Sequence, residues 1–207
     1  MIAALFIAMA VGGSAPAATP NPGFDCTRAT GQAEELVCTD AQLSMLDRET
    51  SRLYALASHS AQLDTKQRAR LRAYQIGWIR GRNDCWKAAD LRACVLGSYV
   101  TRIHELRRDY PAARGADADG ISSGPVGVAC EGADQPLAAT FIRTDPPLAR
   151  LESLDRRYIM TLTPTASGAR YVTGTHEGEV SFWTKGDAAL LQLPGQAAIH
   201  CTIGAPR

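Results

Sequence analysis

The chain has almost no excess of charge of either sign. Its 207 residues include 22 basic and 21 acidic side chains, for a formal net charge of +1. This balance gives no overall electrostatic reason to expect a nucleic-acid partner or an anionic membrane surface. Cys-x-x-Cys pairs and Gly-rich phosphate loops are absent, and none of the four histidines lies at zinc-finger spacing from a cysteine. We therefore expect no cofactor and no metal.

Long apolar runs are missing as well. The N-terminal run ends near Val11, well short of the ~20 residues that a membrane-spanning helix needs. Residues 1–18 combine this run with a small-residue segment, Ala15-Pro16-Ala17, and predict a cleaved signal peptide, although no Lys or Arg precedes the run. No cysteine follows that would carry a bacterial lipid anchor. We expect a protein exported to the periplasm or secreted, without a stable membrane span.

Cysteine is present in an even number that suits an exported chain. The cysteines are Cys26, Cys38, Cys85, Cys94, Cys130 and Cys201. Export permits disulfides, so all six are expected to be structural and not metal-binding or catalytic. Many connectivities are possible. The sequence-local set is our prediction: Cys26–Cys38, Cys85–Cys94 and Cys130–Cys201.

Residues 111–125 have the composition of a linker, with one large apolar residue among Gly, Ala, Ser, Asp and Pro. The periodicity differs on either side of this segment. We therefore predict two domains, a helical domain at 24–110 and a β domain at 126–207, joined by the linker 111–125.

Before the linker, apolar residues recur with helical spacing in three runs. The runs are Leu43, Leu46, Leu53 and Ala57; then Leu71, Tyr74 and Trp78; then Leu91, Val95, Tyr99, Ile103 and Leu106. Thr39 with Gln42 and Asp64 with Gln67 form capping pairs for the first two helices, and Asp90 precedes the third. Trp78 is expected in the core, because it shares a helical phase with Leu71.

After the linker, short strands alternate with turn residues. The candidates are 126–130, 137–143, 149–154, 158–163, 169–173, 179–184, 188–193 and 198–203. Eight short strands in so few residues predict a small antiparallel barrel or sandwich. The expected fold class is α+β in separate domains: a disulfide-braced three-helix module followed by a small antiparallel β-barrel of about eight strands.

Two short strings stand between Cys130 and Cys201. They read Ser167-Gly168-Ala169-Arg170-Tyr171 and Phe182-Trp183-Thr184-Lys185-Gly186. This pattern resembles the membrane-bound and periplasmic inhibitors of c-type lysozyme (the MliC/PliC family), in which an SGxxY loop and an aromatic-TKG segment enter the lysozyme cleft. The resemblance implies that the chain is an inhibitor and not an enzyme. It implies a lysozyme-binding site made of Ser167, Gly168, Tyr171, Thr184 and Lys185.

The first half carries a second resemblance, over residues 24–108. Its marks include Phe24-Asp25-Cys26, Leu46-Asp47, Arg82-Asn83-Asp84-Cys85 and Cys94. These residues resemble the N-terminal domain of LprI-type lysozyme inhibitors. The resemblance implies the fold of this module, whereas its role in such proteins is often undefined.

The motif residues suit an inhibitor on chemical grounds. Gly168 allows a tight bend that presents the short hydroxyl of Ser167, and Lys185 offers an ammonium to an ionised carboxylate. Because strand residues alternate, one of Phe182 and Trp183 should point inward and the other outward. Alternatively, Ser167 is an ordinary turn serine and Lys185 an edge-strand lysine, and neither binds a partner protein.

Two other functions, a hydrolase and an envelope adaptor, are alternatives to inhibition. A hydrolase triad of Ser167, His176 and Asp187 lacks a nucleophile elbow. A non-enzymatic envelope adaptor that binds peptidoglycan or another exported protein is the stronger alternative. In the helical half, Arg80, Arg82 and Arg102 form a ligand-binding patch or, as we favour, are solvated or pair with Asp47, Asp84 and Glu105 along helix faces. The oligomeric state is not predicted.

Overall fold

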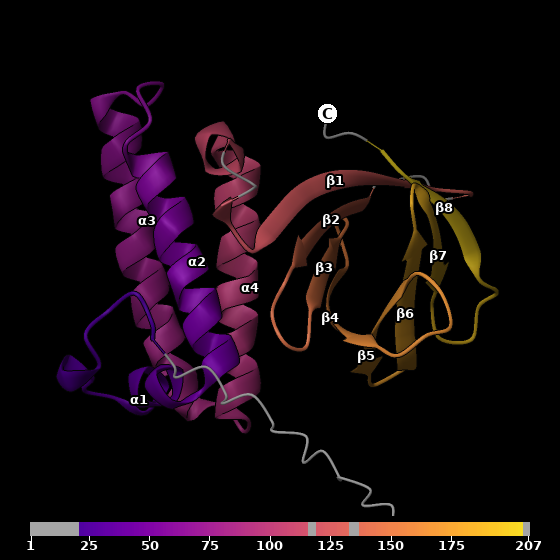
Figure 1. Ribbon diagram of the computed structural model, residues 1–207, viewed down its shortest axis with the longest axis horizontal. Helices are drawn as coiled ribbons and strands as arrows, with labels where there is room; N and C mark the ends of the chain where they lie inside the picture. Colours follow the sequence, from indigo (N-terminus) through magenta and orange to yellow (C-terminus); the bar gives the residue numbers. More distant parts are fainter. Residues whose placement is uncertain (1–20, 116–118, 133–136, 205–207) are drawn as a thin grey trace, which may run out of the picture.

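The computed structural model describes residues 21–115, 119–132 and 137–204, so the predicted signal peptide at 1–18 lies outside the described residues (Figure 1). The helical part contains η1 (Cys26–Arg28), α1 (Gln32–Thr39), α2 (Ala41–Ser58), α3 (Thr65–Asn83), η2 (Asp84–Lys87), α4 (Leu91–Asp109) and η3 (Pro111–Arg114). Eight strands follow: β1 (Ser122–Cys130), β2 (Leu137–Ile142), β3 (Leu148–Glu152), β4 (Arg157–Thr163), β5 (Ala169–Thr175), β6 (Gly178–Lys185), β7 (Ala188–Gln192) and β8 (Ile199–Ile203). No helix within these ranges has the length and apolar character that a bilayer crossing requires.

The predicted starts of α3 and α4 are confirmed, and that of α2 is corrected. Asp64 and Gln67 form a reciprocal capping box at α3, and the side chain of Asp90 accepts a hydrogen bond from the Ala93 amide at α4. At α2 the cap is Asp40, which accepts from the Leu43 amide at 2.9 Å. Thr39 instead ends α1, a short helix that the three-run pattern did not reveal. The helical part therefore has four helices in place of three.

The core of the helical part lies between α2 and α4. It buries most of the predicted residues, including Leu43, Leu46, Leu53, Val95, Tyr99, Ile103 and Leu106. Helix α3 contributes much less, since only Leu71 and Arg82 are buried there. Tyr74, expected on the same face as Leu71, is 55% exposed, and Trp78 is half-buried against the core. The predicted core face of α3 is therefore correct at Leu71 and wrong at Tyr74.

All three disulfides pair as predicted. Cys26–Cys38 ties η1 to α1, and Cys85–Cys94 ties η2 to α4. Cys130–Cys201 joins two residues that face each other across β1 and β8. No cysteine of the described ranges is free.

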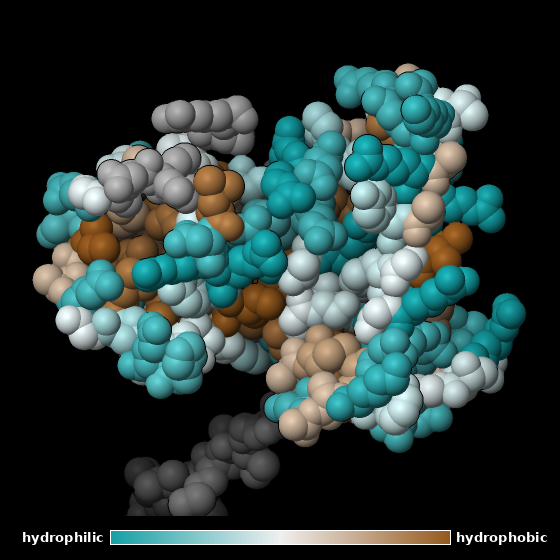
Figure 2. All heavy atoms as spheres, turned by 180° about the vertical axis from the view of Figure 1, so that it is seen from behind, coloured by the Kyte–Doolittle hydropathy of each residue, from teal (hydrophilic) through white to brown (hydrophobic). Residues whose placement is uncertain are grey.

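The eight strands close into an antiparallel barrel in which each strand pairs with its sequence neighbours and β1 pairs with β8. The predicted strand number and architecture are confirmed. Alternate residues fill the interior, among them Leu151, Met160, Phe182 and Leu191. Brown hydrophobic atoms gather on the barrel side of Figure 2, whereas teal hydrophilic ones are spread over the helical side.

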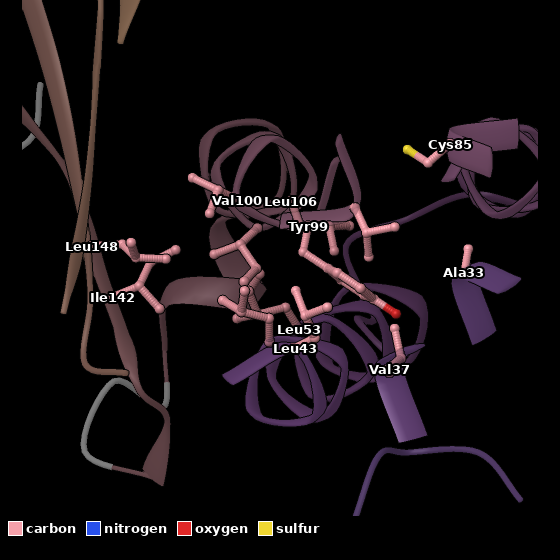
Figure 3. Packing of buried hydrophobic residues seen from close by; sticks show 14 of the residues in the cluster. Ala33, Val37, Leu43, Leu53, Cys85, Tyr99, Val100, Leu106, Ile142 and Leu148 are labelled. Atoms are coloured by element: carbon pink, nitrogen blue, oxygen red, sulfur yellow. The ribbon is translucent and has the colours of Figure 1, made fainter. Parts of the chain in front are cut away.

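The two halves share a core. Residues 111–125, expected to form a linker, hold η3 and the start of β1, and Ala113 is fully buried. Ile142 and Leu148, on the outer face of β2 and β3, belong to the same buried cluster as the helices. Figure 3 shows both side chains pointing from the sheet toward the helical core. The division into two domains stays a prediction, and the described barrel packs directly on α4.

Polar contacts surround this shared core. Arg107 of α4 donates from Nε to the Gly124 carbonyl at 2.6 Å, and Arg150 of β3 donates to Thr101 Oγ1 at 2.9 Å. His104 Nδ1 lies 2.8 Å from Thr140 Oγ1. The contact therefore has a specific register between α4 and the outer face of β2 and β3, in addition to its apolar area.

His104 makes this contact sensitive to acid. The imidazole is 1% exposed, and Nε2 has no hydrogen-bond partner in the described ranges. Burial, followed by the charge of Arg150, lowers the pKa of His104 to about 4; Glu152 and Asp109 act in the opposite direction and Arg108 in the same one. The folded protein therefore holds His104 neutral at a pH where the unfolded chain protonates it.

We expect the free energy of unfolding to fall by about 3 kcal/mol more between pH 7 and pH 4 in the wild type than in His104→Gln. The unfolded chain takes up a proton on His104 below pH ~6.5 and the native protein does so only near pH 4, so stability is lost across this interval. Urea unfolding at both pH values measures the difference. Equal pH dependence in the two proteins would contradict the assignment.

Candidate functional site

Both motif strings lie at one rim of the barrel. The β4–β5 loop leads into β5, whose first residue, Ala169, pairs with Thr184 near the end of β6. Lys185 then pairs with Ala188 across the two-residue turn between β6 and β7. Residues 164–168 and 185–187 are therefore neighbours in space, and we call them the motif rim.

Glycine is required at position 168 for two independent reasons. Its φ is +71°, a conformation that side chains with a Cβ rarely adopt. A Cβ there would lie 2.4 Å from the Thr184 carbonyl oxygen and 3.0 Å from the Trp183 indole. The close approach of the loop to β6 thus depends on the absence of a side chain.

The indole of Trp183 holds the Ser167 backbone in place. Trp183 Nε1 donates to the Ser167 carbonyl oxygen at 2.8 Å. Trp183 is half-exposed on the outer face of β6, whereas Phe182 is fully buried inside the barrel, which confirms the predicted alternation. Ser167 itself is exposed, and its hydroxyl has no hydrogen-bond partner among the residues that the structure covers. The loop is anchored by its backbone and leaves this hydroxyl available.

Lys185 is an exposed cation of the motif rim. It ends β6 beside Gly186, whose φ of +58° suits a two-residue hairpin turn. Four arginines of the barrel each pair with a carboxylate: Arg150, Arg156, Arg157 and Arg170. Within the described ranges Lys185 has neither a carboxylate nor a hydrogen-bond partner. The motif rim therefore carries an ammonium and a hydroxyl that no other described residue binds.

Tyr171 and Thr184 are more buried than Ser167 and Lys185. Tyr171 is 8% exposed, pairs with Phe182 and packs against Phe141 with ring centroids 5.6 Å apart. Burial raises the pKa of its phenol. Thr184 is half-buried on the same face of β6 as Phe182. Both residues lie beneath the rim and support it from inside the barrel.

The residues of the imagined triad are not brought together. Ser167 precedes β5, whereas His176 follows β5 in the turn to β6 at the opposite rim. The seven residues of β5 separate the two by about 20 Å at the rise of an extended strand. Within the part of the chain that the structure describes, no group of His, Cys, Asp and Glu could hold a metal.

The arginines singled out in the helical half separate into three environments. Arg82 is buried and hydrogen-bonded to Tyr99, with Asp47 at 3.6 Å and Glu34 at 3.4 Å. The pairing with Asp47 is one of the predicted contacts, and it is buried. Arg80 is exposed. Arg102 is buried beside Glu105, at 3.2 Å, as predicted.

Known proteins match both halves of the chain. Residues 128–200 match the family model of MliC, described as membrane-bound lysozyme-inhibitor of c-type lysozyme. The chain is 33% identical over 176 residues to the lipoprotein LprI of Mycobacterium bovis and to that of Mycobacterium tuberculosis, covering 80% of this chain and 83% of theirs. The chain belongs to the LprI family. No solved structure matches it.

Membership in the LprI family confirms both resemblances found in the sequence. The MliC match begins in β1 and ends in β8, so it covers the barrel and includes the whole motif rim. The match to the LprI proteins extends well beyond the barrel. The chain is therefore an LprI-like helical part followed by an MliC-type barrel.

Proposed function

We propose that this protein is an exported inhibitor of c-type lysozyme that inserts the Ser167 loop and Lys185 into the lysozyme cleft. The observation that supports this most strongly is the motif rim, where an exposed hydroxyl and an exposed ammonium, neither bound by another described residue, lie on neighbouring turns. The MliC family description supports lysozyme as the partner. An inhibitor family also supports a chain that is not itself an enzyme.

The chemistry of the target fits these two groups. A lysozyme cleft holds two carboxyl groups, a general acid with a raised pKa and a second group that stays ionised. The ammonium of Lys185 pairs with the ionised carboxylate, and exclusion of water strengthens this charge-assisted bond. The Ser167 hydroxyl donates or accepts a hydrogen bond at the second carboxyl group, because it serves either protonation state.

Preorganisation makes this rim suitable for tight binding. The Trp183–Ser167 hydrogen bond and the close approach at Gly168 hold the loop before the partner arrives. A loop that is already ordered loses less conformational entropy on binding. In this proposal Gly168 sets the shape of the loop, Thr184 and Tyr171 support it from below, and Ser167 and Lys185 make the decisive contacts.

The same relatives support an exported location. The LprI proteins of both mycobacteria are named lipoproteins. Three disulfides in this chain suit an oxidising compartment. A protein in the cell envelope or outside it would meet lysozyme where that enzyme acts.

Removal of the Ser167 hydroxyl tests the proposal. We expect Ser167→Ala to weaken inhibition of c-type lysozyme about tenfold, the effect of one hydrogen bond to a charged group, with an unchanged melting temperature. Inhibition is measured as loss of lysozyme activity during titration with the full chain. Ser51→Ala, which removes an exposed hydroxyl from α2, is the matched control and should inhibit like the wild type. Equal inhibition by Ser167→Ala would contradict the role of this loop.

A further inference from the structure

Helix α3 concentrates charge of one sign. It carries Lys66, Arg68, Arg70, Arg72, Arg80 and Arg82 and no acidic residue. It is also the long helix with the fewest buried side chains. The near-neutral total of the chain conceals this local excess, which favours anions near α3.

A groove runs between α3 and α4. Two hollows of about 590 and 570 Å³ share Arg70, Tyr74, Arg102 and Glu105 and therefore adjoin. One extends to Tyr110, beyond the end of α4, and the other to Trp78. The groove thus combines guanidinium groups with aromatic rings.

Arg102 is the buried base of this groove. Its side chain is 6% exposed; Nε donates to Gln75 at 3.0 Å and Nη1 donates to Glu105 at 3.2 Å. Nη2 is buried and has no hydrogen-bond partner in the described part of the chain. A buried guanidinium N–H without an acceptor is unfavourable and rare in native proteins. Arg102 lines both hollows, so a small rotation of its guanidinium toward the groove would bring this N–H to an oxygen ligand.

Arg70 supplies a second, exposed guanidinium. It lies over the Tyr74 ring at 5.4 Å and donates to the Tyr74 hydroxyl at 3.3 Å. It has no carboxylate partner among the residues that the structure includes. The charges of Arg102 and Arg70 both act on Tyr110, where they oppose the rise in phenol pKa that burial causes. Both arginines also line the two adjoining hollows, so the two guanidinium groups border the same groove.

We propose that the α3–α4 groove binds a small ligand that carries a carboxylate or phosphate group attached to a ring. The oxyanion accepts hydrogen bonds from Arg102 Nη2 and from Arg70, a geometry for which guanidinium groups are well suited. The ring lies against Tyr74 and Trp78, whose faces suit the apolar face of a sugar or a flat ring. This site belongs to the helical part and is independent of the motif rim.

Two matched pairs of probes test the site by NMR titration of the full chain, read at the Trp78 indole and the surrounding amides. N-acetylmuramic acid is compared with N-acetylglucosamine, which lacks the carboxylate, and glucose 6-phosphate with glucose. We expect at least one acid to shift these signals and both neutral sugars to leave them in place. A response to the sugar acid alone identifies a carboxylate site, and a response to the phosphate alone identifies a phosphate site. No response to either acid would overturn the proposal.

Substitution then locates the contact. Arg70→Gln should raise the dissociation constant of the binding acid about tenfold, and because Arg70 is exposed the fold should be retained, as the melting temperature verifies. Arg72→Gln removes the same charge about 200° further around α3, outside the groove, and should change the constant less than twofold. Equal effects of the two substitutions would overturn the site. Lysozyme inhibition by Arg70→Gln should equal that of the wild type, which separates this site from the proposed function.

Discussion

Reversal of the charge at position 185 is expected to abolish inhibition. Lys185→Glu should raise the concentration needed for half-inhibition of c-type lysozyme roughly 100-fold or more, because a desolvated like-charge contact replaces an ion pair. Lys185 is exposed and has no partner among the described residues, so the substitution removes no interaction within the free protein. The melting temperature should therefore stay within about 1 °C, as expected for a surface position without contacts.

Two companion variants sharpen this result. Lys185→Arg keeps the positive charge and should retain most of the inhibition, although the planar guanidinium fits the contact less well. Lys66→Glu makes the same charge change at an exposed position of α3 and should inhibit like the wild type. If Lys185→Glu and Lys66→Glu weaken inhibition to the same extent, net charge and not the motif rim governs the interaction with lysozyme.

Loss of the Cys130–Cys201 disulfide is expected to have the largest effect on stability. The two residues are 71 positions apart, and closure of a loop of this length stabilises the folded state by about 4 kcal/mol in the chain-entropy model. The bond also secures the junction of β1 and β8, the last pair that closes the barrel. The double substitution Cys130→Ser/Cys201→Ser should lower the free energy of unfolding in urea by that amount.

The Cys26–Cys38 bond provides the control for loop length. Its residues are 12 positions apart, and the same model gives about 3 kcal/mol for its removal. Replacing this pair by serine should therefore have the smaller effect. The opposite order of the two losses would show that local packing, and not loop closure, determines what these disulfides contribute.

Much of the fold was predictable because the signals are local. Strand alternation and turn residues predicted eight strands, and the contrast of Phe182 with Trp183 follows from the period of two. The capping box of Asp64 and Gln67 depends on residues three positions apart. The predicted start of α2 was wrong by one residue. Asp40 and not Thr39 caps α2, and Thr39 is the last residue of α1.

Contacts between distant segments were not predictable from one sequence. The alternation in β2 and β3 does not reveal that the outer residues Ile142 and Leu148 meet another core. The range 111–125 has a linker composition, but η3 within it buries Ala113. In the motif rim, the sequence motifs suggest Ser167 and Lys185 as site residues, whereas the hydrogen bond from Trp183 to the Ser167 carbonyl depends on the register of β5 and β6.

The environment of Arg102, whose Nη2 has no hydrogen-bond partner among the described residues, is beyond sequence reasoning for the same reason. Its exposure and its neighbours depend on how α3 packs on α4, and a charged residue on a helix is most often solvated. The concentration of basic residues on α3 was visible in the sequence. The net charge of +1 for the whole chain, which sums basic and acidic residues, does not reveal it.

A double-mutant cycle between Lys185 and the ionised catalytic aspartate of c-type lysozyme tests the central claim most directly. Binding constants are measured for the wild-type pair, for Lys185→Ala, for the lysozyme aspartate changed to asparagine, and for both changes together. Direct contact predicts a coupling energy of about 2 kcal/mol or more, as found for close charge pairs across interfaces. A coupling energy near zero, with both single changes measurable, would contradict the entry of Lys185 into the lysozyme cleft.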